Sequence, residues 1–150
     1  MDKRYNVFGI GNAIVDTEVQ VEDLLLSTHG LDKGIMTLVS ADDQASLLEG
    51  LSGYEQHGAA GGSAANTMVG LAQYGGTAFF SGKIGDDMSG ALYRESMAEV
   101  GVEFDVEPTN GAPTGTCLIL VTPDGERTMQ TALGAAADID APDVDADRIA

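Results

Sequence analysis

The sequence predicts an α/β protein with a largely parallel sheet and a second, smaller sheet. Short apolar segments alternate with a helical segment through residues 77–106, which is the rhythm of a βαβ unit. The chain contains 20 glycines, many of them at element ends, and these indicate tight turns. Further strand-like segments do not follow the βαβ rhythm. We therefore expect some of them to form a separate sheet that projects from the α/β body as a lid over a cleft.

The first half of the chain predicts short elements with clear boundaries. A buried strand is expected over 5–11, and alternating polar and apolar residues predict a half-exposed strand over Thr17–Val21. A short helix should follow from Glu22 and end at Gly30. After a strand over Gly34–Val39, Ser40 is expected to cap a helix that runs to about Leu51. The last element of this half is a strand over 54–59.

The second half begins with a glycine turn that feeds a helix of small residues over Gly61–Gly76, and a strand over 77–84 follows. We expect an amphipathic helix over 86–100, with four apolar side chains toward the core (Met88, Leu92, Met97 and Val100). A strand over 102–106 precedes two strands, 113–121 and 126–132, which are joined by a turn over 123–125. Near the C-terminus, Pro142 and the aspartates around it predict a helix start.

Composition limits the classes of function. The chain has 150 residues, 43% of them apolar, so it can form one ordinary domain with a sizeable core. There are 24 acidic and 7 basic residues, a net charge of −17, which argues against partners such as nucleic acid or an anionic membrane. One cysteine, Cys117, excludes an internal disulfide framework, and with two histidines it leaves too few ligands for a zinc site. No apolar segment is long enough for a membrane span or signal peptide, so we expect a cytoplasmic protein.

The first candidate site follows the first strand, where Asn12 and Asp16 lie in the segment GNAIVD. Ligands of α/β sheets bind at the carboxyl ends of strands. An ionised carboxylate there can accept hydrogen bonds from both hydroxyls of a vicinal diol. From spacing alone, an Asx turn between two strands is the favoured interpretation.

The second candidate is the turn Gly61–Gly62 with Asn66 in the helix that follows. Paired glycines allow a ligand to approach the backbone, and the start of the helix offers free N–H groups. The alternative is a helix entry whose small residues pack against the sheet.

Two more features remain open. In the segment GKIGDDMSG, Asp86 is best explained as an acidic N-cap at a strand-to-helix turn. Arg127, in the hairpin, is one of few basic residues and is suited to meet a phosphate. An exposed hairpin arginine is an equally good explanation. Two nucleotide-binding patterns fail, because Ile14 replaces the third glycine of a dinucleotide fingerprint and Ile84 follows the lysine of a P-loop-like stretch.

The order of four segments resembles the pfkB (ribokinase-like) family of carbohydrate and nucleoside kinases. These segments are GNAIVD, GGSAANT, GKIGDDMSG and PTGTCLILVTPDGERT, and the resemblance covers essentially all 150 residues. Met68 departs from it, since a small residue is usual there. Within the family, the forms around Asn12 and Pro113–Cys117 are most similar to the adenosine kinases.

The resemblance implies a Rossmann-type αβα sandwich with a small β-sheet lid, cut after about the first half. The chain would be the N-terminal part of one kinase domain, with lid strands within 17–21, 35–39, 54–59, 113–121 and 126–132. It implies substrate contacts through Asn12, Asp16, Gly61, Gly62 and Asn66, and a phosphate-facing role for Arg127. The turn before Arg127 has one extra residue. Cys117 is expected to be a buried strand residue.

The implied reaction is ATP-dependent transfer of a phosphoryl group to a hydroxymethyl group of a ribose-containing substrate, most simply adenosine to AMP in purine salvage. The family's general base lies in a Gly-Ala-Gly-Asp motif, which is not found here. ATP and Mg²⁺ sites are therefore expected mainly outside these residues, and the chain alone should be inactive. Two alternatives stay open, a ribose or fructose kinase and a non-catalytic ligand-binding half. The protein would be a monomer or homodimer.

Overall fold

The computed structural model describes residues 4–149, which form two compact units. Of the described residues, unit 1 comprises 4–15, Ala59–Gly115 and 133–149, and unit 2 comprises Asp16–Gly58 and Thr116–Ala132. Each unit therefore combines segments that are far apart in the sequence. Within the described residues, no helix has the length and apolar character that crossing a membrane requires.

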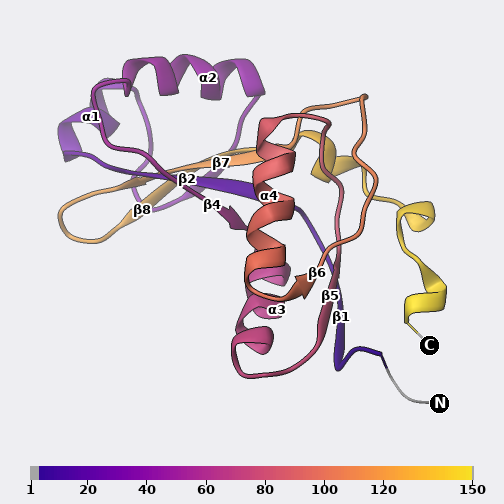
Figure 1. The fold of residues 1–150 in the computed structure, drawn as a ribbon. Coiled ribbons are helices and arrows are strands. Elements are labelled where there is room, and N and C mark those ends of the chain that lie inside the picture. Colours follow the sequence, from indigo (N-terminus) through magenta and orange to yellow (C-terminus); the bar gives the residue numbers. More distant parts are fainter. Residues whose placement is uncertain (1–3, 150) are drawn as a thin grey trace. The chain divides into compact units, whose positions relative to one another are not determined.

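Unit 1 is built on a parallel three-stranded sheet in the order β1 (Val7–Ile10), β5 (Ala78–Ser81) and β6 (Val102–Glu103). The helices α3 (Ser63–Gln73) and α4 (Met88–Glu99) pack on the same face of this sheet (Figure 1). Their core includes Phe80, Tyr93 and Met97, whose side chains are fully buried. The predicted βαβ unit and parallel sheet are confirmed.

Two predictions for unit 1 are wrong in detail. The first strand is not a buried one, since Val7 and Ile10 are 39% and 49% exposed at the edge of the sheet. In α4, Met88 is 90% exposed and Leu92 is 39% exposed. The buried side of this helix follows Gly90, Tyr93 and Met97, a spacing of three and four residues that leaves Met88 and Leu92 outside the stripe.

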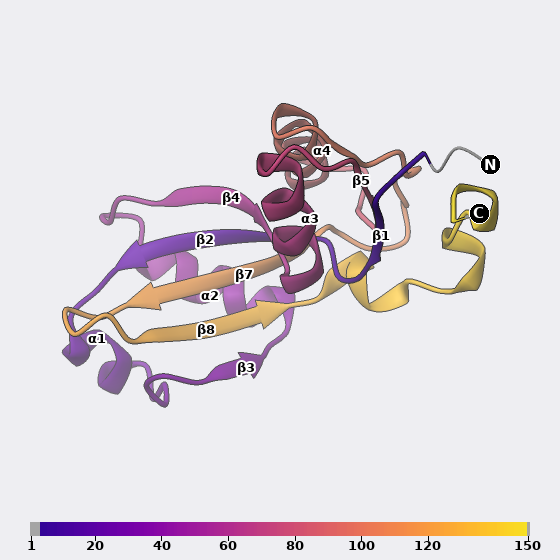
Figure 2. The ribbon, with the colours of Figure 1, turned by 90° about the horizontal axis from the view of Figure 1, so that it is seen from below.

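The second sheet has five strands and is built mainly in unit 2 (Figure 2). Its order is β3 (Met36–Leu38), β8 (Arg127–Ala132), β7 (Gly115–Val121), β2 (Ile14–Gln20) and β4 (His57–Gly61). The strands β7 and β8 form an antiparallel hairpin, and β3 runs parallel to β8. All five strands expected outside the βαβ rhythm lie in this one sheet.

One face of the second sheet is covered by α1 (Asp23–Thr28) and α2 (Ala41–Gly50). Strand residues Val19, Leu118 and Leu120 pack there against leucines of the helical segments. The Ser40 hydroxyl accepts a hydrogen bond from the Asp43 N–H, and Gly30 has a φ of +64°, so both predicted helix boundaries hold.

The last segment forms three 3₁₀ turns, Gly134–Asp138, Ala141–Asp143 and Ala146–Arg148. The helix start predicted at Pro142 is one of these turns, and Asp140 caps it. The segment packs on unit 1, where the Arg148 guanidinium lies 4.8 Å from the centroid of the Phe79 ring. The Ser81 hydroxyl also donates a 2.9 Å hydrogen bond to the Asp143 carbonyl.

Candidate substrate site

The glycine turn at the start of α3 touches the segment that follows β1. Gly62 has a φ of +99°, a backbone conformation that residues with a Cβ atom rarely adopt. A Cβ atom there would run into the Asn12 carbonyl oxygen. The Gly62 carbonyl accepts a 2.8 Å hydrogen bond from the Asn66 N–H, and the Gly61 carbonyl accepts one of 3.2 Å from the Tyr93 hydroxyl. Asn12, Gly61, Gly62 and Asn66 are thus brought together within unit 1.

The polar groups of this turn remain available. Gly62 is the N-cap of α3 and has no side chain to bond the first N–H groups of the helix. The side chains of Asn12 and Asn66 are exposed, and neither forms a side-chain hydrogen bond with another described residue. The turn can therefore offer both N–H donors and amide groups to a ligand.

This turn lies at the carboxyl end of the parallel sheet. The Gly11 N–H donates a 3.1 Å hydrogen bond to the Ser81 carbonyl, so the ends of β1 and β5 meet. A Cβ atom at Gly82 would lie 3.0 Å from the Cβ of Ala13. This is the edge at which α/β sheets bind their ligands.

The segment GKIGDDMSG supports the fold rather than a ligand. Asp87, not Asp86, is the N-cap of α4, and its carboxylate accepts hydrogen bonds from the Gly90 N–H and from the N–H and hydroxyl of Thr114, at 2.7–2.8 Å. Burial alone would raise the pKa of Asp87, but these hydrogen bonds hold it below its ordinary value. Asp86 is exposed and has no such role.

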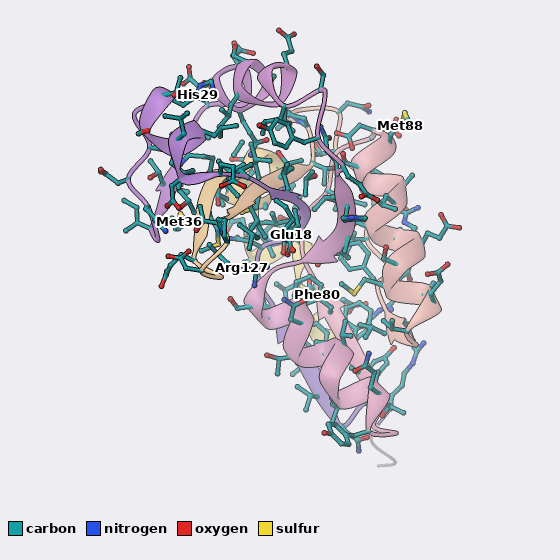
Figure 3. All side chains as sticks on the ribbon, turned by 90° about the vertical axis from the view of Figure 1, so that its left-hand side faces the viewer. Glu18, His29, Met36, Phe80, Met88 and Arg127 are labelled. Carbon is teal, nitrogen blue, oxygen red and sulfur yellow. The ribbon has the colours of Figure 1, made fainter. Side chains whose placement is uncertain are left out.

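Unit 2 brings the other two predicted site residues onto one face of its sheet. Arg127 donates from Nη2 to Oε2 of Glu18 at 3.2 Å. Both side chains are labelled in Figure 3. Asp16 lies two residues before Glu18 in β2, and side chains two apart in a strand share a face. Asp16, Glu18 and Arg127 therefore form one charged group on the face opposite the helices.

Asp16 is half-buried, and this changes its electrostatics. Burial raises the pKa of the Asp16 carboxyl above its ordinary value, and the nearby Arg127 guanidinium opposes that rise. A carboxylate that has lost part of its water accepts hydrogen bonds from ligand hydroxyls more readily than a fully hydrated one. Burial likewise raises the pKa of the Cys117 thiol, which is 6% exposed and therefore the small strand residue expected.

An apolar strip continues from this charged group across the same face. Register pairs Ile119 of β7 with Met129 of β8, and Met129 in turn with Met36 of β3. Leu38 shares the face with Met36, and these two side chains are 60% and 52% exposed. The face thus changes from charged at β2 to apolar at β3.

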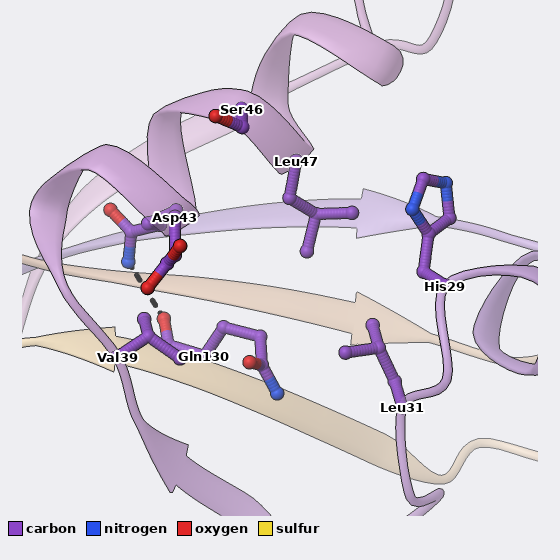
Figure 4. Close-up of a pocket in the computed structure, with 8 residues that line it drawn as sticks. His29, Leu31, Val39, Asp43, Ser46, Leu47 and Gln130 are labelled. Atoms are coloured by element: carbon purple, nitrogen blue, oxygen red, sulfur yellow. Dashed lines mark hydrogen bonds between the residues drawn. The ribbon is translucent and has the colours of Figure 1, made fainter.

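A cavity of about 260 Å³ lies on the opposite, helix-covered side of this sheet (Figure 4). It is bordered by Leu47 and Asp43 of α2, by Gln130 of β8 and by His29. None of the predicted site residues lines it.

Sequence reasoning missed Glu18, Met36 and Leu38. Glu18 could have been found from the alternation of Thr17–Val21 extended back to Asp16, because that pattern puts Asp16 and Glu18 on one face. No signal in the sequence pairs β3 with β8. Among residues 4–149, no three His, Cys, Asp or Glu side chains are arranged to hold a metal ion.

This α/β architecture, with one parallel and one mixed sheet, matches the ribokinase-like fold of adenosine and sugar kinases. The chain belongs to the pfkB family of carbohydrate kinases, whose family model matches residues 35–150.

The individual relatives include both adenosine kinases and fructokinases. An adenosine kinase of Schizosaccharomyces pombe is 32% identical over 138 residues, which are 88% of this chain and 38% of the relative. A fructokinase of Escherichia coli is 35% identical over 80 residues, 53% of this chain and 26% of that protein. The crystal structure of adenosine kinase from Sinorhizobium meliloti matches with a TM-score of 0.86 and 42% identity, over 96% of this chain and 44% of that one. The chain spans less than half the length of these relatives.

Proposed function

We propose that this chain supplies the substrate-binding side of an ATP-dependent kinase that phosphorylates the 5′-hydroxyl of a purine nucleoside, most simply adenosine to AMP. The observation that carries the proposal is one face of the second sheet, where the Asp16 carboxylate and the Arg127 guanidinium are followed by exposed apolar side chains. A ribose diol, a phosphate and a flat base are the three parts of such a substrate and its product.

Each residue has a role that its chemistry supports. Asp16 accepts hydrogen bonds from the 2′- and 3′-hydroxyls and so orients the ribose. In unit 1, the N–H groups after Gly62 and the Asn66 amide, with Asn12 beside them, have the chemistry to bind sugar hydroxyls. Arg127 stabilises the negative charge that develops on the transferred phosphoryl group.

ATP with Mg²⁺ supplies the phosphoryl group in such a kinase. Of the described residues, Arg127 has the chemistry and exposure to meet a phosphate, whereas no carboxylate cluster fits the metal ion. A general base is likewise not assigned to any described residue, so we expect the 150-residue chain alone to transfer no phosphate.

The apolar strip favours a nucleoside over a free sugar. A ribose or fructose molecule has few apolar groups to pack against Met36 and Leu38, whereas a purine base has two faces. The fructokinase relative keeps a sugar kinase as the second candidate. For the nucleoside kinase, we place the reaction in purine salvage in the cytoplasm.

The test is ADP formation by the protein expressed from the uninterrupted reading frame, with Mg-ATP and adenosine, inosine, ribose or fructose. Activity confined to a purine nucleoside, and reduced at least about 100-fold by Asp16→Ala, is the expected result. Activity on a free sugar would select the sugar kinase. If the reading frame ends at residue 150 and its protein binds nucleoside without turnover, the non-catalytic ligand-binding half is the correct function. Turnover by the isolated 150 residues would contradict the expectation that they lack the general base.

A further inference from the structure

Arg127 is not free in this structure. Its guanidinium donates to Glu18 at 3.2 Å, and no other described residue is a hydrogen-bond partner of its side chain. Glu18 lies two residues after Asp16 on the same face of β2, so the guanidinium lies near two carboxylates. The positive charge proposed to meet the phosphoryl group is therefore already balanced before any phosphate is bound.

The ion pair is weak enough to be exchanged. The side chains of Arg127 and Glu18 are 56% and 42% exposed, and pairs with this exposure contribute little free energy. A phosphate monoester carries up to two negative charges and three acceptor oxygens, so it is the stronger partner for a guanidinium.

The exchange nevertheless weakens phosphate binding. If Arg127 leaves Glu18 for the phosphate, the ion pair is lost. If Arg127 keeps both partners, the Glu18 carboxylate lies close to the phosphate and repels it. Both routes act in the same direction, and neither affects a ligand without a phosphate.

We propose that Glu18 is a specificity residue that competes with the phosphoryl group for Arg127, so that the site favours the unphosphorylated nucleoside over its 5′-monophosphate. This inference rests on the proposed function. Glu18 thereby promotes release of the phosphorylated product, while Asp16 holds substrate and product alike through the ribose.

The test measures the dissociation constants of adenosine and AMP by calorimetry, in the protein expressed from the uninterrupted reading frame. Glu18→Gln, which removes the charge and keeps the shape, should tighten AMP binding about two- to fivefold and leave adenosine binding unchanged. The same substitution in an Arg127→Ala background should leave the affinity for AMP unchanged, because the competition acts through Arg127. Glu22→Gln removes an exposed carboxylate of the same unit and is the matched control, with no expected change in either constant.

Several outcomes would overturn the proposal. Unchanged or weaker AMP binding in Glu18→Gln would exclude competition. Equal tightening with and without Arg127 would show direct repulsion of the phosphate by Glu18 instead. If Asp16→Ala abolishes adenosine binding while Glu18→Gln does nothing, only the role of Glu18 fails. If the wild-type protein binds neither adenosine nor AMP, the nucleoside kinase function fails as well.

Discussion

At the scale of single residues, the binding role proposed for Asp16 would oppose stability. Its pKa is raised by burial, so the folded protein holds a proton on this carboxyl more tightly than the unfolded chain does. The stabilising contribution is therefore fully present below the ordinary carboxyl pKa and is lost as the pH rises through the raised one. The ionised form of Asp16 therefore destabilises the fold relative to the protonated form.

Asp16→Asn should accordingly raise the free energy of unfolding at pH 7. The gain should be below about 1 kcal/mol, since the side chain is only half-buried, and it should vanish in acid, where the wild-type carboxyl is itself protonated. Urea unfolding across pH measures this difference. Asp32→Asn, at an exposed position of the same unit, is the control. A gain that stays constant with pH would contradict the electrostatic explanation.

Gly62 gives a second prediction at this scale, because a Cβ atom there would strike the Asn12 carbonyl in a backbone conformation that disfavours side chains. Gly62→Ala should destabilise the protein by about 1–3 kcal/mol. Gly70→Ala is the matched control inside the same helix, where a Cβ atom would meet nothing within 4 Å. That control should be neutral or stabilising by up to about 1 kcal/mol. Equal effects of the two substitutions in denaturant unfolding would contradict this account.

At the scale of elements, the start of α4 is held to a distant loop by one carboxylate. Asp87 bonds the first turn of its own helix and the Thr114 backbone and hydroxyl, which belong to the segment before β7. One residue thus fixes both the helix N-terminus and the approach to the next strand.

Asp87→Ala should therefore lower the free energy of unfolding by about 1–3 kcal/mol at pH 7. The pKa of Asp87 is lowered in the folded state, so its contribution is present above the ordinary carboxyl pKa and is lost as the pH falls through the lowered one. The difference between variant and wild type should shrink in acid. Asp86→Ala changes an exposed neighbour and should cost little in the same thermal or urea titration; a larger loss from Asp86→Ala would restore Asp86 as the cap.

At the scale of the whole molecule, net charge dominates the electrostatics. Within residues 4–149, five basic residues pair with carboxylates: Arg4, Lys33, Lys83, Arg127 and Arg148. Arg148 alone contacts Glu103, Asp105 and Asp145. With 24 acidic and 7 basic residues, the sequence still carries a net charge of −17.

Salt should consequently stabilise this protein. Raising NaCl from about 0.05 to 0.5 M shortens the Debye length and screens the repulsion more than it weakens the exposed pairs, so Tm should rise by a few degrees. KCl at the same ionic strength is the control and should give the same shift. A fall in Tm would mean that the ion pairs, rather than the surplus charge, govern stability.

Much of this molecule could be predicted from local pattern. Ser40 as a cap, Gly30 as a stop and the hairpin turn ending at Gly125 each depend on a few adjacent residues, and all three are present. The predicted N-cap of α4 was wrong by one residue. Two adjacent aspartates offer the same chemistry, and only the contact with Thr114 selects Asp87. The prediction that Met88 and Leu92 face the core was wrong, because an apolar residue does not reveal which side of its helix will be covered.

For the candidate site, the sequence by itself determined which residues are available: an early carboxylate, a glycine turn before a helix and one hairpin arginine. Tertiary structure decided which other residues lie beside them. Only strand register places Met36 opposite Met129, and only the sheet brings Arg127, more than 100 positions away in the chain, to Glu18. Pattern reports the neighbours of a residue along the chain, whereas strand pairing joins segments whose separation leaves no periodic signal.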